Sequence, residues 1–159
     1  MIRIRRSVFE TNSSSTHSIC ITKNKPEEIP TMCRFGLGEY GWEYRRLDGQ
    51  EKANYLYTAI MCQNDHESLK QRLFETLSDL GIVCEFEEPK YDKYGYPEGF
   101  YIDHSYEIRP VVMAILHSKN RLLRYLFSED SFVLTGNDNG DCDIDIKVSY
   151  PHEEYYKGN

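Results

Sequence analysis

No apolar run in this sequence approaches the length of about 20 residues that a membrane-spanning helix needs. There is no CxxC pair among its 5 cysteines, and an odd number without that spacing is typical of reduced thiols rather than of a disulfide framework. The basic start at residues 1–6 is followed by polar residues, so no signal-peptide core is expected. These absences predict a protein of the cytoplasm and argue against a membrane protein.

The sequence also lacks the complete motifs of several enzyme classes. Neither a GxxxxGK[ST] phosphate-binding loop nor a GxSxG nucleophile elbow occurs. Residues 135–143 resemble a calcium-binding loop, but Thr135 stands at its first position and Ile146 stands where its last carboxylate is required. A tight Asn/Gly turn between two strands explains that segment. The lack of a complete catalytic motif favours a binding protein over an enzyme, and no catalytic residue is assigned.

Positive charge is scarce as well. The chain holds 19 Lys and Arg against 26 Asp and Glu, a net charge of −7. Residues 51–99 alone carry 5 basic and 10 acidic side chains. Because a protein that binds duplex nucleic acid usually presents a basic face, we expect no direct sequence-specific nucleic-acid binding. An acidic surface instead suits a basic protein partner, or it serves solubility alone.

Tyrosine, in contrast, is abundant, with 13 residues. Three of them fall in the Gly- and Pro-rich segment 88–99, which reads as a loop or hairpin tip and follows an acidic strand. Tyrosine is enriched at protein interfaces because it joins apolar area to a polar tip. The predicted partner-binding face therefore consists of three carboxylates and three tyrosines: Glu85, Glu87, Glu88, Tyr91, Tyr94 and Tyr96.

Hydrophobic patterning predicts a single α+β domain over residues 1–159, with a mostly antiparallel sheet packed against about four helices. Asp65 is the expected N-cap of the second helix and Gly81 its stop. The predicted helices cover residues 51–63, 66–80, 109–117 and 119–127, and the predicted strands cover residues 2–9, 17–22, 82–87, 100–103, 131–135 and 142–150. Residues 23–50 are predicted to be irregular, with Tyr40, Trp42 and Tyr44 holding this loop onto the core.

Two polar segments contain candidate metal ligands. Residues 9–18 (FETNSSSTHS) end in an imidazole, and residues 102–105 (IDHS) place Asp103 beside His104. Zinc prefers imidazole nitrogen and thiolate sulfur, so the predicted zinc ligands are His17, His104 and Cys33, with Asp103 in support. The alternative is that both histidines are hydrogen-bonded residues at strand ends and that residues 9–18 form a turn whose side chains bond to the backbone.

Five segments are distinctive in combination: residues 6–18 (RSVFETNSSSTHS), 38–43 (GEYGWE), 51–57 (EKANYLY), 101–105 (YIDHS) and 126–139, which ends in TGNDN. Together they resemble an uncharacterised family of proteins encoded by phages and bacterial genomes, although Ser105 replaces the usual Gln of that family. The resemblance implies a phage or prophage origin and supplies no established activity. Small acidic phage proteins include inhibitors of host defence, among them anti-CRISPR proteins that bind Cas9.

Three functions follow from these observations. The first is a defence inhibitor that acts by protein binding, with a host defence protein such as Cas9 as its partner, because such effectors hold nucleic acid in positively charged channels. The second is a metal-dependent hydrolase of a phosphate-bearing substrate, in which His17, Asp103 and His104 act as ligands or acid/base groups. The third is a DNA-binding accessory protein that uses the arginines of residues 3–6, which the net charge of −7 disfavours.

Overall fold

The computed structural model of the chain describes residues 15, 17–103, 105, 108–136 and 154–158. Its helices are α2 (Gly49–Met61), α3 (His66–Ser78), α4 (Arg109–His117) and α5 (Lys119–Phe127). Its strands are β1 (His17–Ile21), β2 (Met32–Phe35), β3 (Glu39–Tyr40), β4 (Arg45–Leu47), β5 (Val83–Phe86), β6 (Lys90–Tyr91), β7 (Pro97–Glu98), β8 (Tyr101–Ile102), β9 (Phe132–Thr135) and β10 (Glu154–Gly158). The predicted α+β class, with four helices in the described residues, is confirmed.

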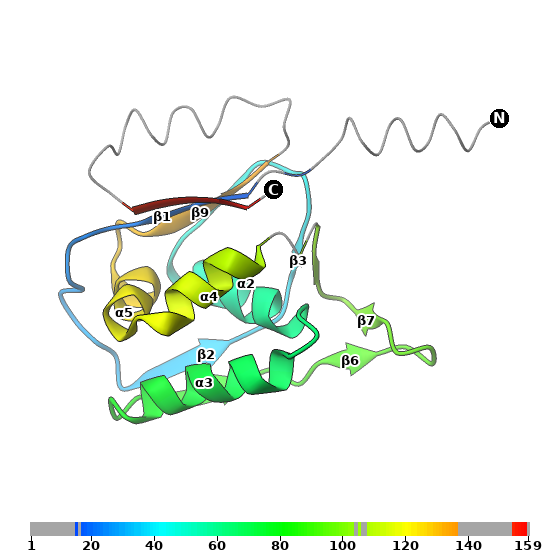
Figure 1. Ribbon diagram of the computed structural model, residues 1–159, viewed down its shortest axis with the longest axis horizontal. Helices are drawn as coiled ribbons and strands as arrows, with labels where there is room; N and C mark the ends of the chain where they lie inside the picture. The colour runs from blue at the N-terminus through cyan, green and yellow to red at the C-terminus, as the bar shows by residue number, and fades with distance from the viewer. Residues whose placement is uncertain (1–14, 16, 104, 106–107, 137–153, 159) are drawn as a thin grey trace.

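The largest sheet has the strand order β10-β1-β9-β4, and all its neighbours are antiparallel. Helices α2, α4 and α5 lie along one face of this sheet, and α3 lies farther from it (Figure 1). Strands β1 and β9 are buried along their whole length. Because both faces of β1 are covered, its side chains do not alternate between buried and exposed, and His17 and Ser18 are buried along with its apolar residues.

The side chains on the two faces of the main sheet belong to two different hydrophobic clusters. Ile19 and Ile21 point into the large core under the helices, whereas Cys20 groups with Phe132 and Leu134 in a second cluster. Because successive side chains of a strand point to opposite faces, this division follows directly from the sequence of β1. The predicted strands at residues 2–9 and 142–150 lie outside the described residues.

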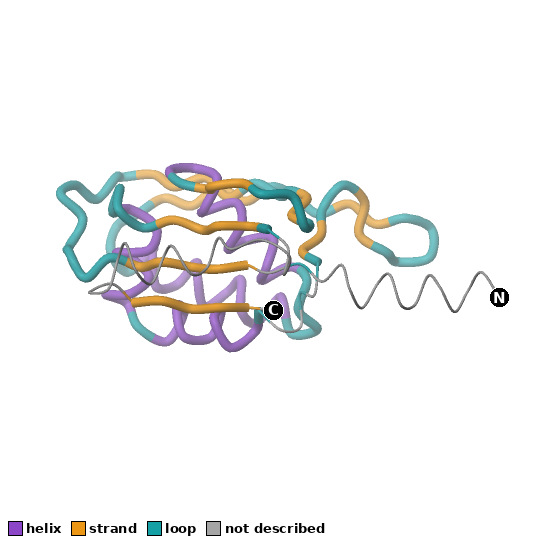
Figure 2. Tube along the Cα trace, turned by 90° about the horizontal axis from the view of Figure 1, so that it is seen from above, coloured by secondary structure: helices purple, strands orange, loops and turns teal. Residues whose placement is uncertain are grey.

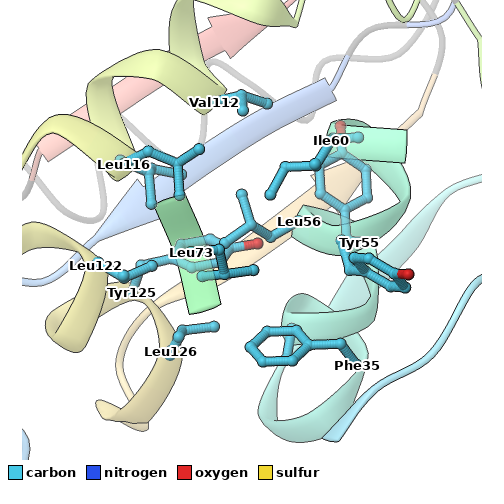
Figure 3. Close-up of a cluster of buried hydrophobic side chains, with 14 of the residues drawn as sticks. Phe35, Tyr55, Leu56, Ile60, Leu73, Val112, Leu116, Leu122, Tyr125 and Leu126 are labelled. Carbon is cyan, nitrogen blue, oxygen red and sulfur yellow. The ribbon is translucent and has the colours of Figure 1, made fainter. Parts of the chain in front are cut away.

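Helix α2 is the centre of the core (Figure 3). Its residues Tyr55, Leu56 and Ile60 are each 1% exposed or less. The hydroxyl of Tyr125, on α5, donates to the backbone oxygen of Lys52 at 2.6 Å. A helix that is buried on most of its surface needs few propensity signals, because tertiary packing supplies its stability.

Helix α3 buries the stripe Leu69, Leu73 and Leu77, as its spacing predicts, and Gly81 ends the segment at φ +77°. The predicted N-cap is wrong in one respect, because the Asp65 side chain makes no capping hydrogen bond. Its carboxylate instead forms a bidentate ion pair with Arg109, at 2.6 and 2.9 Å. This contact joins the start of α3 to the start of α4.

Residues 23–50 are more regular than predicted. They contribute β2, which pairs in parallel with β5, and β3, which pairs in parallel with β8. They also contribute β4, the edge of the main sheet. Tyr40 is buried as expected, but Trp42 and Tyr44 are 53% and 64% exposed, so the prediction that they hold this segment on the core is wrong.

Candidate functional site

The β6–β7 hairpin projects from the body of the protein (Figures 1 and 2), and it carries exposed aromatic side chains. Tyr94 and Tyr96, at the hairpin tip, are 71% and 69% exposed. We call the following set the aromatic end: Trp42, Tyr44, Tyr91, Tyr94, Tyr96 and Tyr101. Its members are 43–71% exposed. Folded proteins seldom leave so much aromatic surface in water without using it for contact, since the burial of each ring is strongly favourable.

The hairpin tip is held by one carboxylate. Oδ1 of Asp92 accepts the backbone N–H groups of Tyr94 and Tyr96, at 2.8 and 2.9 Å. The backbone closes the turn with a bond from Gly95 to Asp92 at 3.0 Å, and Gly95 adopts φ +85°. Asp and Gly are the residues that such a turn favours, because Asp bonds its own backbone and Gly tolerates positive φ. The two tip tyrosines are therefore presented on a fixed backbone.

The base of the hairpin is anchored in the core. The ring of Tyr91 contacts the buried ring of Phe100 edge to face, with centroids 5.9 Å apart. Strand β8 follows directly and pairs in parallel with β3, so that Tyr101 stands opposite Glu39. A Cβ atom at Gly41 would lie 3.1 Å from the hydroxyl of Tyr101, so the ring of Tyr101 lies across this glycine. These contacts join Glu39 and Gly41 to Tyr101, and the base of the hairpin to the core through Phe100.

The three predicted carboxylates have different surroundings. Glu85 forms an ion pair with Arg34 at 2.7 Å, and both side chains are exposed. Oε2 of Glu87 accepts the backbone N–H of Leu37 at 2.8 Å. Glu88 is exposed and lies at the start of the segment that enters the hairpin. The ion pair offsets part of the local negative charge, so Glu88 is the carboxylate of the three that is best placed to act on a partner.

The predicted zinc ligands are not brought together by the described residues. His17 is 3% exposed, and its two ring nitrogens lie 2.8 Å from the hydroxyl of Tyr55 and 2.8 Å from the backbone oxygen of Gly41. A carbonyl only accepts, so Nε2 of His17 carries the proton and, in the neutral ring, Nδ1 accepts from Tyr55. His104 lies outside the described residues, and no group of three metal-binding side chains occurs within them.

Cys33 lies on β2 directly opposite Cys84 of β5. Both are free thiols, and Cys33 is 8% exposed. Burial, with a smaller contribution from the neighbouring Cys84, raises the pKa of Cys33 to about 12. A thiol with so high a pKa is a poor nucleophile and is protonated at neutral pH. The two reduced thiols therefore act as packing side chains of the core.

Lys52 is a buried charge that the sequence does not reveal. Its side chain is 1% exposed, and Nζ donates to the backbone oxygens of Ser128 and Ser131 at 2.5 and 2.9 Å. Burial lowers the pKa of Lys52 to about 8, although the carboxylates of Asp48, Asp130 and Glu129 act in the opposite direction. Because lysine is almost never buried unless it is paired, the sequence leads one to expect an exposed side chain at this position. Nothing in the neighbouring residues indicates its burial. The amine ties the loop after α5 to α2.

The sequence also failed to indicate that Trp42, Tyr44 and Tyr101 belong to the exposed aromatic set. The glycines near Tyr40 and Trp42 were a possible signal. Glycine in such a segment often marks a place where another part of the chain approaches closely. In the polar segment 9–18, residues 9–14 lie outside the described residues. Ser15, His17 and Ser18 of the same segment are buried. No helix in the described parts of the chain is long and apolar enough to span a bilayer.

Comparisons with known proteins do not assign the chain to a family. No family model matches the sequence, and no significant match was found among the curated proteins or the solved structures. The resemblance to a phage-encoded family therefore stays a prediction from the sequence segments that carry it.

Proposed function

We propose that this protein acts by binding another protein through its aromatic end, as a phage- or prophage-encoded inhibitor of host defence. The observation that carries the proposal is the hairpin, which holds Tyr94 and Tyr96 in solvent on a turn fixed by Asp92. Tyrosine anchors on a rigid support are characteristic of protein-binding surfaces, because little side-chain entropy is lost when they are buried.

The proposed partner is a basic protein of the bacterial cytoplasm, with a Cas9-type effector as the leading candidate. Such effectors hold nucleic acid in positively charged channels. A chain with a net charge of −7 is attracted to such a channel over long range, and exposed aromatic rings then supply short-range affinity. The same charge disfavours direct binding of nucleic acid.

The proposal is tested by the inhibition of target-DNA cleavage by a purified Cas9–guide RNA complex. We expect inhibition by the wild type and a large loss of inhibition by the double variant Tyr94→Ala/Tyr96→Ala. The matched control is Ile29→Ala/Phe74→Ala, which removes two exposed apolar side chains, 49% and 41% exposed, outside the aromatic end. Wild-type protein that neither binds the complex nor slows cleavage contradicts the choice of partner.

A zinc ion bound by His17, His104 and Cys33 stays a separate prediction. For His17 to act as a ligand, one ring nitrogen must give up its contact with Tyr55 or with Gly41. Elemental analysis of wild-type protein and of His104→Ala, purified without chelators, tests the prediction, and zinc-free wild-type protein contradicts it. The alternative function, a metal-dependent hydrolase, depends on this ion, and no observation in the described residues favours it.

A further inference from the structure

We propose that the aromatic end selects arginine side chains, so that the partner segment it binds is rich in arginine rather than generally basic. The inference rests on the proposed function and adds the chemical class of the bound segment. Two features carry it: exposed ring faces that can stack on a guanidinium, and a carboxylate that stands beside one of these rings.

The ring faces of this protein already bind cations of the same chain. Nζ of Lys93 lies 4.8 Å from the ring centroid of the exposed Tyr94. The guanidinium of Arg46 lies 3.8 Å from the ring centroid of Phe132. The guanidinium of Arg45 lies 5.7 Å from the ring centroid of Tyr40, so both kinds of cation occupy ring faces in this protein. A planar guanidinium can in addition stack on a ring and is less strongly hydrated than an ammonium. On this general chemistry, an incoming arginine can replace Lys93 on the ring of Tyr94 and add stacking contact that an ammonium does not make.

A carboxylate stands next to a second exposed ring. Glu39 and Tyr101 are register partners in the parallel pair of β3 and β8, and both are exposed while their neighbours Tyr40 and Ile102 are buried. Register partners of neighbouring strands lie about 5 Å apart and point to the same face. An arginine stacked on Tyr101 can thus place its guanidinium in hydrogen-bonding reach of Glu39. A lysine cannot make both contacts with the same geometry.

Single-stranded nucleic acid is the other macromolecule that stacks on exposed aromatic rings. Its phosphates need cations along the same surface, whereas here exposed Glu39 stands beside Tyr101 and exposed Glu98 lies in the hairpin that carries the tip tyrosines. Lys90 stands opposite Glu98 in the hairpin register, so the hairpin has no excess of positive charge there. The charge pattern favours an arginine-rich peptide segment over a nucleic acid.

The test compares two fluorescent peptides of equal length and charge, one built of arginine and glycine and the other of lysine and glycine. Fluorescence anisotropy at fixed ionic strength gives both dissociation constants for wild-type protein. We expect the arginine peptide to bind about tenfold more tightly, as two or three ring contacts imply. Equal affinities overturn the inference, and this comparison needs no variant that could fail to fold.

Variants then locate the selectivity. Tyr94→Leu and Tyr101→Leu keep apolar area but remove the ring faces, and we expect each to lower the arginine-to-lysine ratio toward one while the affinity for the lysine peptide changes less than about twofold. Phe74→Leu, which removes an exposed ring on α3, is the matched control and should leave the ratio unchanged. A ratio that survives both tyrosine changes overturns the assignment to this surface.

Two further arms separate this inference from the proposed function. Tighter binding of a single-stranded oligonucleotide than of the arginine peptide overturns the inference in favour of a nucleic-acid ligand. Inhibition of Cas9 without any preference for arginine overturns the inference but leaves the proposed function standing. A preference for arginine without inhibition of Cas9 supports the inference and removes Cas9 as the partner.

Discussion

Lys52 allows the sharpest quantitative prediction about the fold. In Lys52→Met the chain keeps a side chain of similar length but loses the donor to the backbone oxygens of Ser128 and Ser131. A buried acceptor left without its donor costs about 1–3 kcal/mol, and removal of the buried charge offsets part of this cost. We expect Lys52→Met to be less stable than the wild type near pH 7, by an amount that depends on pH.

The direction of the pH dependence follows from the lowered pKa. Folding takes Lys52 from an ordinary pKa of 10.5 to about 8, so between these values the unfolded chain binds more protons than the folded one. Stability due to Lys52 therefore rises with pH through this window and is smallest below about pH 8. The slope reaches at most about 1.4 kcal/mol per pH unit, and because the folded amine is already half deprotonated at pH 8, the full linkage from pH 8 to pH 10 is about 2.2 kcal/mol.

Solvent access reduces that value. A cavity of about 310 Å³ lined by Asp48, Lys52 and Glu129 adjoins the amine. We therefore expect the difference in stability between the wild type and Lys52→Met to grow by about 1–1.5 kcal/mol between pH 8 and pH 10, roughly half of the full linkage. Thiols and tyrosines that titrate in the same window are common to both proteins, so their contributions cancel in this difference.

Urea unfolding of the wild type, Lys52→Met and the exposed control Lys119→Met, each at about pH 7.5 and pH 10, measures the effect. The control should show no growth with pH. A difference between the wild type and Lys52→Met that stays constant, or that shrinks as the pH rises, refutes the assignment of a low pKa to Lys52. If Lys52→Met does not fold, an NMR titration of the Lys52 side chain in the wild type gives the pKa directly.

Three further predictions concern the packing around the site. Tyr55→Phe removes the hydroxyl that donates to Nδ1 of His17, and we expect a loss of about 1–3 kcal/mol in urea unfolding; an unchanged midpoint contradicts a stabilising role for this buried hydrogen bond. Gly81→Ala places a side chain at φ +77° where no atom lies within 4 Å of the new Cβ, so we expect a cost of about 1 kcal/mol from the backbone alone, and Gly81→Asn should cost less. Because burial raises the pKa of Cys33 to about 12, its alkylation by a maleimide near pH 8 should be at least about 100-fold slower in native protein than in urea, as mass spectrometry of the labelled peptides can show; equal rates contradict the burial of this thiol.

The helices were predictable from the sequence because their signals are local. The stripe of Leu69, Leu73 and Leu77 has helical spacing, and the bounds of α4 and α5 match the predicted ranges 109–117 and 119–127. The hairpin was indicated by its glycines, prolines and tyrosines, although its strands have only two residues each. Periodicity and turn chemistry act over a few residues and need no knowledge of the partner segment.

What the sequence did not show depends on contacts between distant segments. The parallel pairs β2–β5 and β3–β8 each join a strand that was predicted, within residues 82–87 or 100–103, to a short strand in the segment that was predicted to be irregular. Asp65 occupies the predicted N-cap position, but its side chain binds Arg109 instead of the helix backbone, and that partner lies far along the chain. The surroundings of Tyr101 arise in the same way, since it comes beside Glu39 and Gly41 only after β8 pairs with β3.

The dissociation constant of the complex between this protein and Cas9–guide RNA, compared between the wild type and Tyr94→Ala/Tyr96→Ala, tests the central claim most directly. Tyr94 and Tyr96 at the hairpin tip are 71% and 69% exposed, so their side chains contribute little to the folded core. The double variant should therefore unfold at the same temperature as the wild type. We predict a loss of affinity of at least about 30-fold, corresponding to about 2 kcal/mol for two anchor residues. Equal dissociation constants for two equally stable proteins would contradict the claim that the aromatic end is the binding surface.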